Sequence, residues 1–169
     1  MASKSPVAEE ATLELFRNAF RLHAGGVVVF TMKNEAAQPI GFTATSLASL
    51  SAVPARATFN MIKSSSSYHA ITLGRRVAVN FLSADAHHLG TRFAGPAEQR
   101  FAGDHWHEED GIPVLNDASV VLITDITRIY DQGDNAIIVL NIERGAIREE
   151  HEPLLYYNRG YGTIAPVSA

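Results

Sequence analysis

The segment from Ala136 to Glu143 alternates strictly between two sets of side chains, and this alternation constrains the fold more than any other feature. The even-numbered positions are all apolar, whereas the odd-numbered positions mix Ile137 and Val139 with polar residues. A period of two is the period of a β-strand, in which successive side chains point to opposite faces of the sheet. The pattern therefore predicts an antiparallel sheet with one continuous apolar face.

Strands are predicted along most of the chain. Runs rich in β-branched and aromatic residues, bounded by turn residues, predict seven of them. They are Val27 to Met32, Ile40 to Thr45, Ala57 to Ile62, Val77 to Leu82, Val120 to Tyr130, Ile137 to Arg144 and Leu154 to Tyr157. One amphipathic helix is predicted before them, up to Arg21, because Leu13, Phe16 and Phe20 recur at helical spacing after Pro6.

The order of these elements predicts the fold class. Short helical pieces are expected at Tyr68 to Gly74 and Ala86 to Phe93, but strands and helices do not alternate as in a doubly wound sheet. We therefore expect a mainly β fold, a closed or nearly closed antiparallel barrel with a few peripheral helices. The length of 169 residues suits a single domain over residues 1–169, with residues 1–8 as a flexible N-terminus.

Composition excludes several classes of function. The 14 Lys and Arg against 18 Asp and Glu give a formal charge of −4, so there is no overall basic field for nucleic acid or an anionic membrane. No apolar run has bilayer length and the first ten residues lack a signal-peptide pattern, so a cytoplasmic location is expected. The absence of cysteine excludes disulfides, thiolate catalysis and cysteine-bound metal.

The run from Gly41 to Ser51 carries no charge and threads small hydroxyls between apolar residues. An ordinary half-buried strand would place long charged side chains on its wetted face. Small side chains allow a ligand to approach the backbone, and hydroxyls donate hydrogen bonds at short range. The run therefore fits either the wall of a site for a flat, polar-edged molecule or a buried strand rich in Thr and Ser.

Three further clusters indicate a ligand site. Lys63 and the four serines Ser64 to Ser67 follow a strand, which fits either a phosphate site or a serine N-cap beside a solvated lysine. The sequence Phe93-Ala94-Gly95 is echoed by Phe101-Ala102-Gly103 after Arg100, which fits either a ligand-binding loop or a loop fixed by its aromatic residues. Tyr156 to Gly162 is dense in Tyr, Arg and Gly, which indicates a C-terminal segment fixed on the core or over a planar ligand.

These segments, in this order, resemble the flavin reductase family, the FMN-binding split-barrel proteins that supply reduced flavin to two-component monooxygenases. The likeness runs from Phe20 to Tyr161 and also includes Val79-Asn80-Phe81-Leu82, Gly111-Ile112-Pro113 and Gly133-Asp134. It implies an FMN-binding split β-barrel of Greek-key-like topology and a homodimer with a flavin in each of two clefts between subunits. It also implies hydride transfer from NADH or NADPH to the flavin, and a monooxygenase partner.

The resemblance also implies roles for individual residues. Thr43, Ala44, Thr45 and Ser46 would follow the isoalloxazine edge, with Ser49 and Ser51 nearby. Ser64, Ser67 and Lys63 would meet the phosphate, while Phe93, Ala94 and Gly95 would line the ribityl chain. Arg100 and Phe101 would close the loop, Asn80 would support the flavin wall, and Arg159 and Tyr161 would cover the ring or the nicotinamide. No metal ligand is implied.

One position departs from the family pattern. Members typically have Gly-Asp-His where this chain has Gly133-Asp134-Asn135, a sequence that by composition is a hairpin turn. The family's histidine is implicated in nicotinamide binding, so Asp134 and Asn135 are the candidates for positioning the hydride donor. Asn can hydrogen-bond a carboxamide but cannot become cationic near neutral pH.

Two other interpretations remain at this point. A flavin-binding protein without efficient NAD(P)H reductase activity would keep the flavin segments and lose the histidine. A cupin-like metal site is suggested by His105-Trp106-His107, although the carboxylates that follow are too close in sequence to return to the same ion. The sequence leaves open FMN or FAD, NADH or NADPH, and a fixed or a diffusing flavin.

Overall fold

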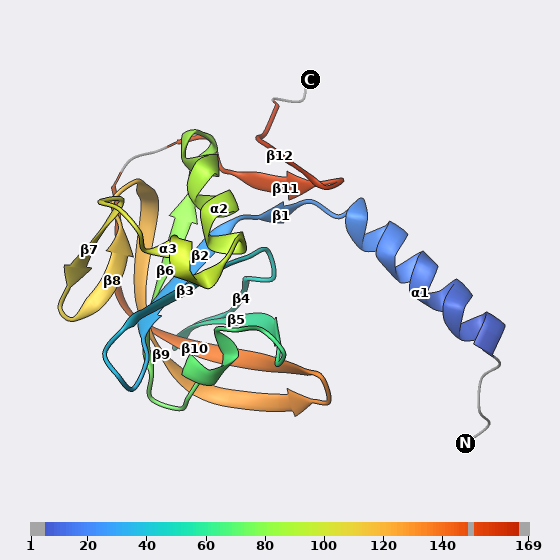
Figure 1. Ribbon diagram of the computed structural model, residues 1–169, viewed down its shortest axis with the longest axis horizontal. Helices are drawn as coiled ribbons and strands as arrows, with labels where there is room; N and C mark the ends of the chain where they lie inside the picture. Colours follow the sequence, from blue (N-terminus) through green and yellow to red (C-terminus); the bar gives the residue numbers. More distant parts are fainter. Residues whose placement is uncertain (1–5, 149–150, 166–169) are drawn as a thin grey trace.

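The computed structural model describes residues 6–148 and 151–165. Its centre is a seven-stranded antiparallel sheet in the order β3-β2-β6-β9-β10-β5-β4, curled into a barrel (Figure 1). The strands are β2 (Val28–Lys33), β3 (Pro39–Ala44), β4 (Ala48–Ala52), β5 (Ala55–Ile62), β6 (Arg76–Leu82), β9 (Ala118–Gln132) and β10 (Asn135–Ile147). The mainly β, antiparallel barrel predicted from the sequence is confirmed.

The alternation in β10 sorts its side chains as expected at most positions. Ala136, Ile138 and Leu140 are fully buried, while Ile137 on the opposite face is 38% exposed. The buried residues join a cluster in which the ring of Phe30 stacks on that of Phe59 at 4.2 Å between centroids. Burial of this apolar face is what fixes the register of β10 against its neighbours, because a slip by one residue would expose it.

The barrel is split between its two edge strands, β3 and β4, which follow each other in sequence. Residues 45–47 connect them without joining the sheet. The hydroxyl of Ser46 bridges this opening to β5: it donates to the carbonyl of Asn60 at 3.0 Å and accepts from the Asn60 amide at 3.1 Å. A single side chain thus replaces part of a missing strand pairing.

Smaller elements surround the barrel. Two helices, α2 (His87–Ala94) and α3 (Ala97–Arg100), cover β3, and a hairpin of β7 (Trp106–Glu109) and β8 (Ile112–Leu115) follows them. Two 3₁₀ turns are η1 (Tyr68–Ala70) and η2 (Ala84–Ala86). A separate three-stranded sheet consists of β1 (Gly25–Gly26), β11 (Leu155–Tyr157) and β12 (Gly160–Gly162). The helix expected at Tyr68 to Gly74 is therefore wrong beyond one short turn.

The predicted N-terminal helix is present as α1 (Pro6–Arg21), and it projects away from the barrel (Figure 1). Of the eight residues expected to be flexible, residues 1–5 lie outside the described part of the chain and residues 6–8 form the start of α1 instead. None of the helices in residues 6–148 and 151–165 has the length and hydropathy needed to cross a bilayer.

Candidate functional site

A pocket of about 350 Å³ lies where the barrel splits, between the ends of β3 and β5 and the loop after α2. It brings together seven of the predicted site residues, namely Thr43, Ala44, Thr45, Ser46, Phe93, Ala94 and Arg100. Its other lining residues are Phe42, Asn60, Met61, Ile62 and Ser65. The pocket therefore has apolar walls with a small number of polar groups, which is usual for a cofactor site.

Arg100 lines this pocket and holds together three segments beside it. Its Nη1 donates to the carbonyl of Gly41 at 2.8 Å and to the hydroxyl of Ser67 at 3.0 Å, while Nε and Nη2 both donate to the carbonyl of Gly95. The residue is only 9% exposed, and burial lowers the pKa of its guanidinium. Arginine remains charged in proteins, so a cation faces the pocket from a fixed position.

The hydroxyls of the Gly41 to Ser51 run act mainly on the scaffold. Thr43 donates to the carbonyl of Gly90 in α2 at 2.7 Å, and Ser46 bridges to β5 as described above. By contrast, the amides of Thr45 and Ser46 make no backbone hydrogen bond within the described residues. These two N–H groups at the pocket are the donors available to a ligand edge.

The close packing behind the pocket depends on Gly41. A Cβ atom there would lie 2.7 Å from a ring atom of Phe93 and 2.9 Å from the carbonyl oxygen of Phe30. Phe93 is fully buried and packs edge-on against Phe101, which packs in turn against Trp106. Phe101 thus supports the pocket from behind and does not line it, contrary to the expected role in closing the loop. Gly95 contributes its carbonyl to Arg100 and does not line the pocket either.

The serine group needs a correction. Ser67 is buried, and its hydroxyl accepts a hydrogen bond from Arg100. It occupies the N-cap position of η1 but makes no side-chain cap bond. Ser64 does not line the pocket, whereas Ser65 does. Lys63 forms an ion pair with Asp131. This pair, together with a hydrogen bond from the Gly133 amide, lowers the pKa of the Asp131 carboxyl. The sequence could not distinguish among four consecutive serines.

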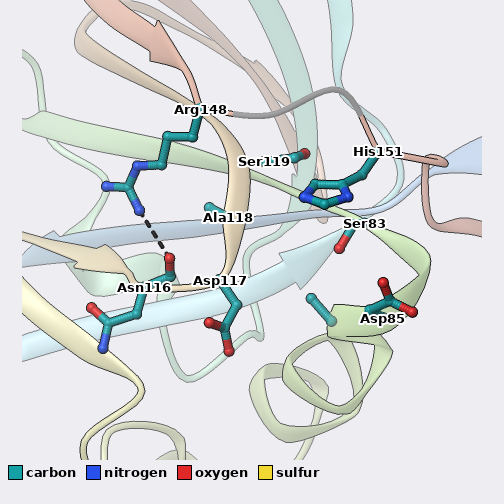
Figure 2. Close-up of a pocket in the computed structure, with 9 residues that line it drawn as sticks. Ser83, Asp85, Asn116, Asp117, Ala118, Ser119, Arg148 and His151 are labelled. Atoms are coloured by element: carbon teal, nitrogen blue, oxygen red, sulfur yellow. Dashed lines mark hydrogen bonds between the residues drawn. The ribbon is translucent and has the colours of Figure 1, made fainter.

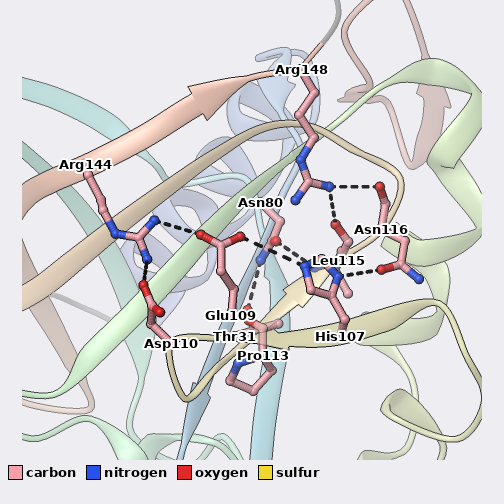
Figure 3. Close-up of polar contacts among 10 residues, drawn as sticks. All are labelled: Thr31, Asn80, His107, Glu109, Asp110, Pro113, Leu115, Asn116, Arg144 and Arg148. Atoms are coloured by element: carbon pink, nitrogen blue, oxygen red, sulfur yellow. Dashed lines mark hydrogen bonds and ion pairs between the residues drawn. The ribbon is translucent and has the colours of Figure 1, made fainter.

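Asn80 does not line the pocket either (Figure 3). It is fully buried, donates to the carbonyl of Val29 and the hydroxyl of Thr31, and accepts from the amide of Leu115 at 3.0 Å. Thr31 in turn donates to the carbonyl of Pro113. Asn80 therefore anchors β8 to β2 and β6 and does not support the wall of the pocket. Its amide fits this place because a buried polar group must be fully hydrogen-bonded.

Ser49 and Ser51 do not line the pocket. Both lie on the edge strand β4, where every residue is exposed, and the hydroxyl of Ser51 donates to the carbonyl of Pro54 at 2.5 Å. Their placement near the flavin edge is not supported within one subunit.

Asp134 and Asn135 lie next to the pocket. Asn135 pairs with Ile62 of β5 in the sheet register, and the amide of Lys63 donates to the carbonyl of Asp134 at 2.9 Å. Paired residues of neighbouring strands place their side chains on the same face, about 5 Å apart at Cβ. Ile62 lines the pocket, so Asn135 is the β10 neighbour of a lining residue, although neither Asn135 nor Asp134 lines the pocket itself.

Tyr161 and Arg159 lie on the β11–β12 hairpin and do not line the pocket. The hydroxyl oxygen of Tyr161 would be 3.0 Å from a Cβ at Gly90, so this ring rests on α2. The Tyr156 and Tyr161 rings meet edge-on at 5.5 Å, which fixes the hairpin. Arg159 is exposed and has a φ of 68°. The C-terminal segment is thus fixed on the core, one of its two predicted arrangements.

The metal hypothesis for His105 and His107 finds no support. His105 contacts the carbonyl of Arg100 at 2.8 Å, and His107 contacts Asn116 at 2.7 Å (Figure 3). The carboxylate of Glu109 pairs with Arg144, which lowers the pKa of Glu109. Among the described residues, no group of three or more His, Asp or Glu could hold a metal ion.

A second, polar pocket of about 330 Å³ lies apart from the first and shares no lining residue with it (Figure 2). Asp85, Asp117 and His151 line it, beside Arg148, which donates to the carbonyls of Leu115 and Asn116. None of the predicted site residues is found there.

Comparison with known proteins identifies the family. A sequence profile described as a flavin reductase like domain matches residues 20–165. The chain belongs to the flavin reductase family. It is 33% identical over 158 residues to an NADH:FMN oxidoreductase of Rhodococcus qingshengii, covering 90% of this chain and 82% of that one.

Two further relatives are similar to this chain over most of its length. A crystal structure of a flavin reductase domain protein from Arthrobacter sp. FB24 superposes with a TM-score of 0.89 at 39% identity, covering 93% of this chain and 98% of that one. The 4-hydroxyphenylacetate 3-monooxygenase reductase component of Pseudomonas aeruginosa is 29% identical, covering 90% and 92%.

Proposed function

We propose that this protein is an NAD(P)H-dependent flavin reductase that binds FMN in the pocket at the barrel split. One observation carries the proposal: the same pocket contains the backbone amides of Thr45 and Ser46, which make no backbone hydrogen bond among the described residues, and the buried guanidinium of Arg100. Amide donors suit the pyrimidine edge of a flavin, and the Arg100 cation with the Ser65 hydroxyl suits its anionic end. The residues present therefore fit the cofactor.

Bound flavin would supply the hydride-accepting ring, and the protein would supply orientation and electrostatics. Thr45 and Ser46 would donate to the ring edge where negative charge accumulates on reduction. Met61, Ile62 and Phe42 would exclude water from its apolar part. Asn135 would hold the carboxamide of NADH or NADPH beside the pocket. FAD in place of FMN is an alternative that the same contacts allow.

The relatives suggest the partner protein for this activity. A monooxygenase that consumes the reduced flavin is the proposed partner, since the Pseudomonas aeruginosa relative is the reductase component of such a system. A homodimer with one flavin in each of two clefts between subunits is proposed as the active form, in the cytoplasm. In this arrangement Arg159 and Tyr161 would cover the ring or nicotinamide of the partner's site.

Turnover tests the proposal. The rate of NADH consumption in air should depend on added FMN, because oxygen reoxidises the reduced flavin and makes it available again. The rate should saturate as the concentration of NADH or of FMN is raised. NADPH and FAD, tested in parallel, define the preferred pair. Consumption of neither nicotinamide with either flavin, by protein that has taken up FMN, would favour a flavin-binding protein without reductase activity.

A further inference from the structure

A third pocket, of about 410 Å³, has a cationic lining, and we call it the arginine hollow. Its lining comes from three places: Lys33 at the end of β2, residues 72–76 at the start of β6, and residues 110–112 where the chain turns from β7 into β8. It shares no lining residue with the pocket at the barrel split. A ligand in one pocket therefore does not compete for the residues of the other.

Arg75 is the residue that distinguishes this hollow. Its Nε is the one buried side-chain nitrogen or oxygen without a hydrogen-bond partner in the part of the chain that the structure describes. Arg75 forms no ion pair with any of these residues either. A buried donor without an acceptor costs folding free energy, and more so when it belongs to a charged group. Such groups are rare in folded proteins, so the Arg75 guanidinium calls for an acceptor.

The backbone around Arg75 is fixed without help from its side chain. The amide of Ile126 donates to the carbonyl of Arg75 at 3.0 Å, and the amide of Gly74 donates to the carbonyl of Ile126 at 2.8 Å. Ile126 is buried in the core, so the loop is held on the barrel at this point. The Arg75 side chain has no contact of its own to maintain there, which leaves its donors to a ligand.

Two further cations line the arginine hollow and keep donors to spare. The ammonium of Lys33 pairs with Glu108 at 2.5 Å, and Arg76 pairs with Glu143 at 3.5 Å. An ammonium has three N–H donors and a guanidinium has five, so neither is exhausted by one carboxylate. Both add positive charge and hydrogen-bond donors beside Arg75.

The single carboxylate in the lining does not neutralise Arg75. Asp110 is turned toward Arg144, whose Nη2 lies 2.7 Å from its carboxylate (Figure 3). The charge of Arg75 is therefore unbalanced among the residues that the structure describes, and the hollow favours an anion.

Backbone groups add neutral donors. The amides of Leu73 and Gly111 make no backbone hydrogen bond within residues 6–148 and 151–165. Gly74 and Gly111 have φ values of 76° and 80°, and a Cβ on either would meet nothing within 4 Å. The backbone is thus open on two sides of the hollow, where an anion can approach N–H groups closely.

We propose that the arginine hollow binds a phosphate group, held by the Nε and Nη donors of Arg75 and by the charges of Lys33 and Arg76. The planar fork of arginine matches two oxygens of an oxyanion, and donors on several sides suit the remaining oxygens of a tetrahedral one. Since Nε is closed to solvent, binding includes a turn of the Arg75 side chain toward the anion. The phosphate is either the free ion or part of a small phosphorylated compound.

Calorimetric titration tests the proposal, with inorganic phosphate and with ribose 5-phosphate, at constant ionic strength. The protein is first saturated with FMN, which keeps both probes out of the pocket at the barrel split. We expect one site per chain, and a dissociation constant raised about tenfold or more in Arg75→Gln. Arg128→Gln removes a cation that does not line the hollow and should leave the affinity unchanged.

Amide NMR spectra locate the site. The signals of Gly74 and Gly111 should shift with either probe, while that of Gly162, on the β11–β12 hairpin, should not. Arg75→Gln should melt no lower than wild type without phosphate, because its side chain has no hydrogen bond to lose. This variant therefore separates loss of binding from loss of folding.

The two probes distinguish the sources of the phosphate. Tighter binding of ribose 5-phosphate would assign the site to a phosphorylated compound, and equal or tighter binding of inorganic phosphate would assign it to the free ion. Binding of neither probe, or equal affinity of wild type and Arg75→Gln, would overturn the inference. A protein that takes up no FMN can be compared with Arg75→Gln in the same way, so failure of the proposed function is separable from failure here.

Discussion

At the scale of single residues, Arg100 is the side chain on which the pocket most depends. Arg100→Ala would remove the guanidinium donors from the buried carbonyl of Gly41, the buried hydroxyl of Ser67 and the partly buried carbonyl of Gly95. We expect the free energy of unfolding to fall by about 2 to 4 kcal/mol, because several buried groups lose their partners together. FMN affinity should fall at least about tenfold with the loss of the charge.

Urea unfolding and FMN titration measure these effects, and Arg92→Ala is the matched control. Arg92 also donates to two carbonyls, of Gln99 and Ala102, but it is exposed. Its loss should cost less than about 1 kcal/mol. Equal losses for the two variants would contradict the role given to Arg100.

Gly41 carries a second prediction at this scale. Gly41→Ala would force its Cβ against Phe93 and the Phe30 carbonyl, so we expect a loss of about 1 to 3 kcal/mol in unfolding free energy. Gly162→Ala meets nothing within 4 Å and should be nearly neutral. Thermal or urea denaturation of the pair measures the difference, and a neutral Gly41→Ala would show that Phe93 is free to move.

Asn135 is where the family pattern and this chain differ. Asn135→His would add a group able to carry charge beside the pocket, so we expect about tenfold faster flavin reduction by NADH, with FMN affinity unchanged. Asn135→Ala should slow the reduction of flavin by NADH. Stopped-flow reduction without oxygen measures both rates, and a slower Asn135→His variant would mean that this position does not meet the nicotinamide.

The sequence alone predicts only part of the pocket lining. Thr43 to Ser46, Phe93, Ala94 and Arg100 were placed at the pocket from the sequence and its resemblance, and the structure brings them together. Ser65 and Asn60 are not predicted from the sequence. The buried serine of the four is Ser67, which is held by Arg100 from a distant segment, and this leaves Ser65 to line the pocket. Asn80 was misplaced because its partners come from β2 and β8.

At the scale of elements, the sequence predicts the long strands and misses most of the short ones, β8 among them. β10 and β9 carry long apolar alternation, whereas β7 has the sequence Trp-His-Glu-Glu and pairs only with β8. β4 lies within the uncharged run, where small polar residues gave no period. β1 is a Gly-Gly pair that local composition predicts as a break, and only pairing with β11 makes it a strand.

The β9–β10 hairpin carries a prediction about pH. Burial, followed by a hydrogen bond with Glu143 and its charge, raises the pKa of Asp125. A raised carboxyl pKa in the folded state means that ionised Asp125 destabilises the protein above that pKa, and that the cost disappears as the pH falls through it. Asp125→Asn should therefore melt higher than wild type at neutral pH, with the difference vanishing in acid. A lower melting temperature at all pH values would contradict this.

At the scale of the whole molecule, the split in the barrel creates the site. The edges β3 and β4 diverge over residues 45–47, and the pocket there joins the ends of β3 and β5 with the segment that carries Arg100. Periodicity predicted a barrel and an amphipathic α1, but it could not show that α1 would leave its own barrel. That arrangement depends on contacts between distant segments, namely Asn158 with Arg21 and β1 with β11.

One measurement tests the central claim most directly: the absorbance spectrum of the purified protein with FMN, and then with NADH in the absence of oxygen. We predict a perturbed flavin spectrum on binding at one FMN per chain, followed by bleaching of the oxidised band when NADH is added. Arg100→Ala should bind less FMN under the same conditions. No flavin uptake by the folded wild-type protein would contradict the account.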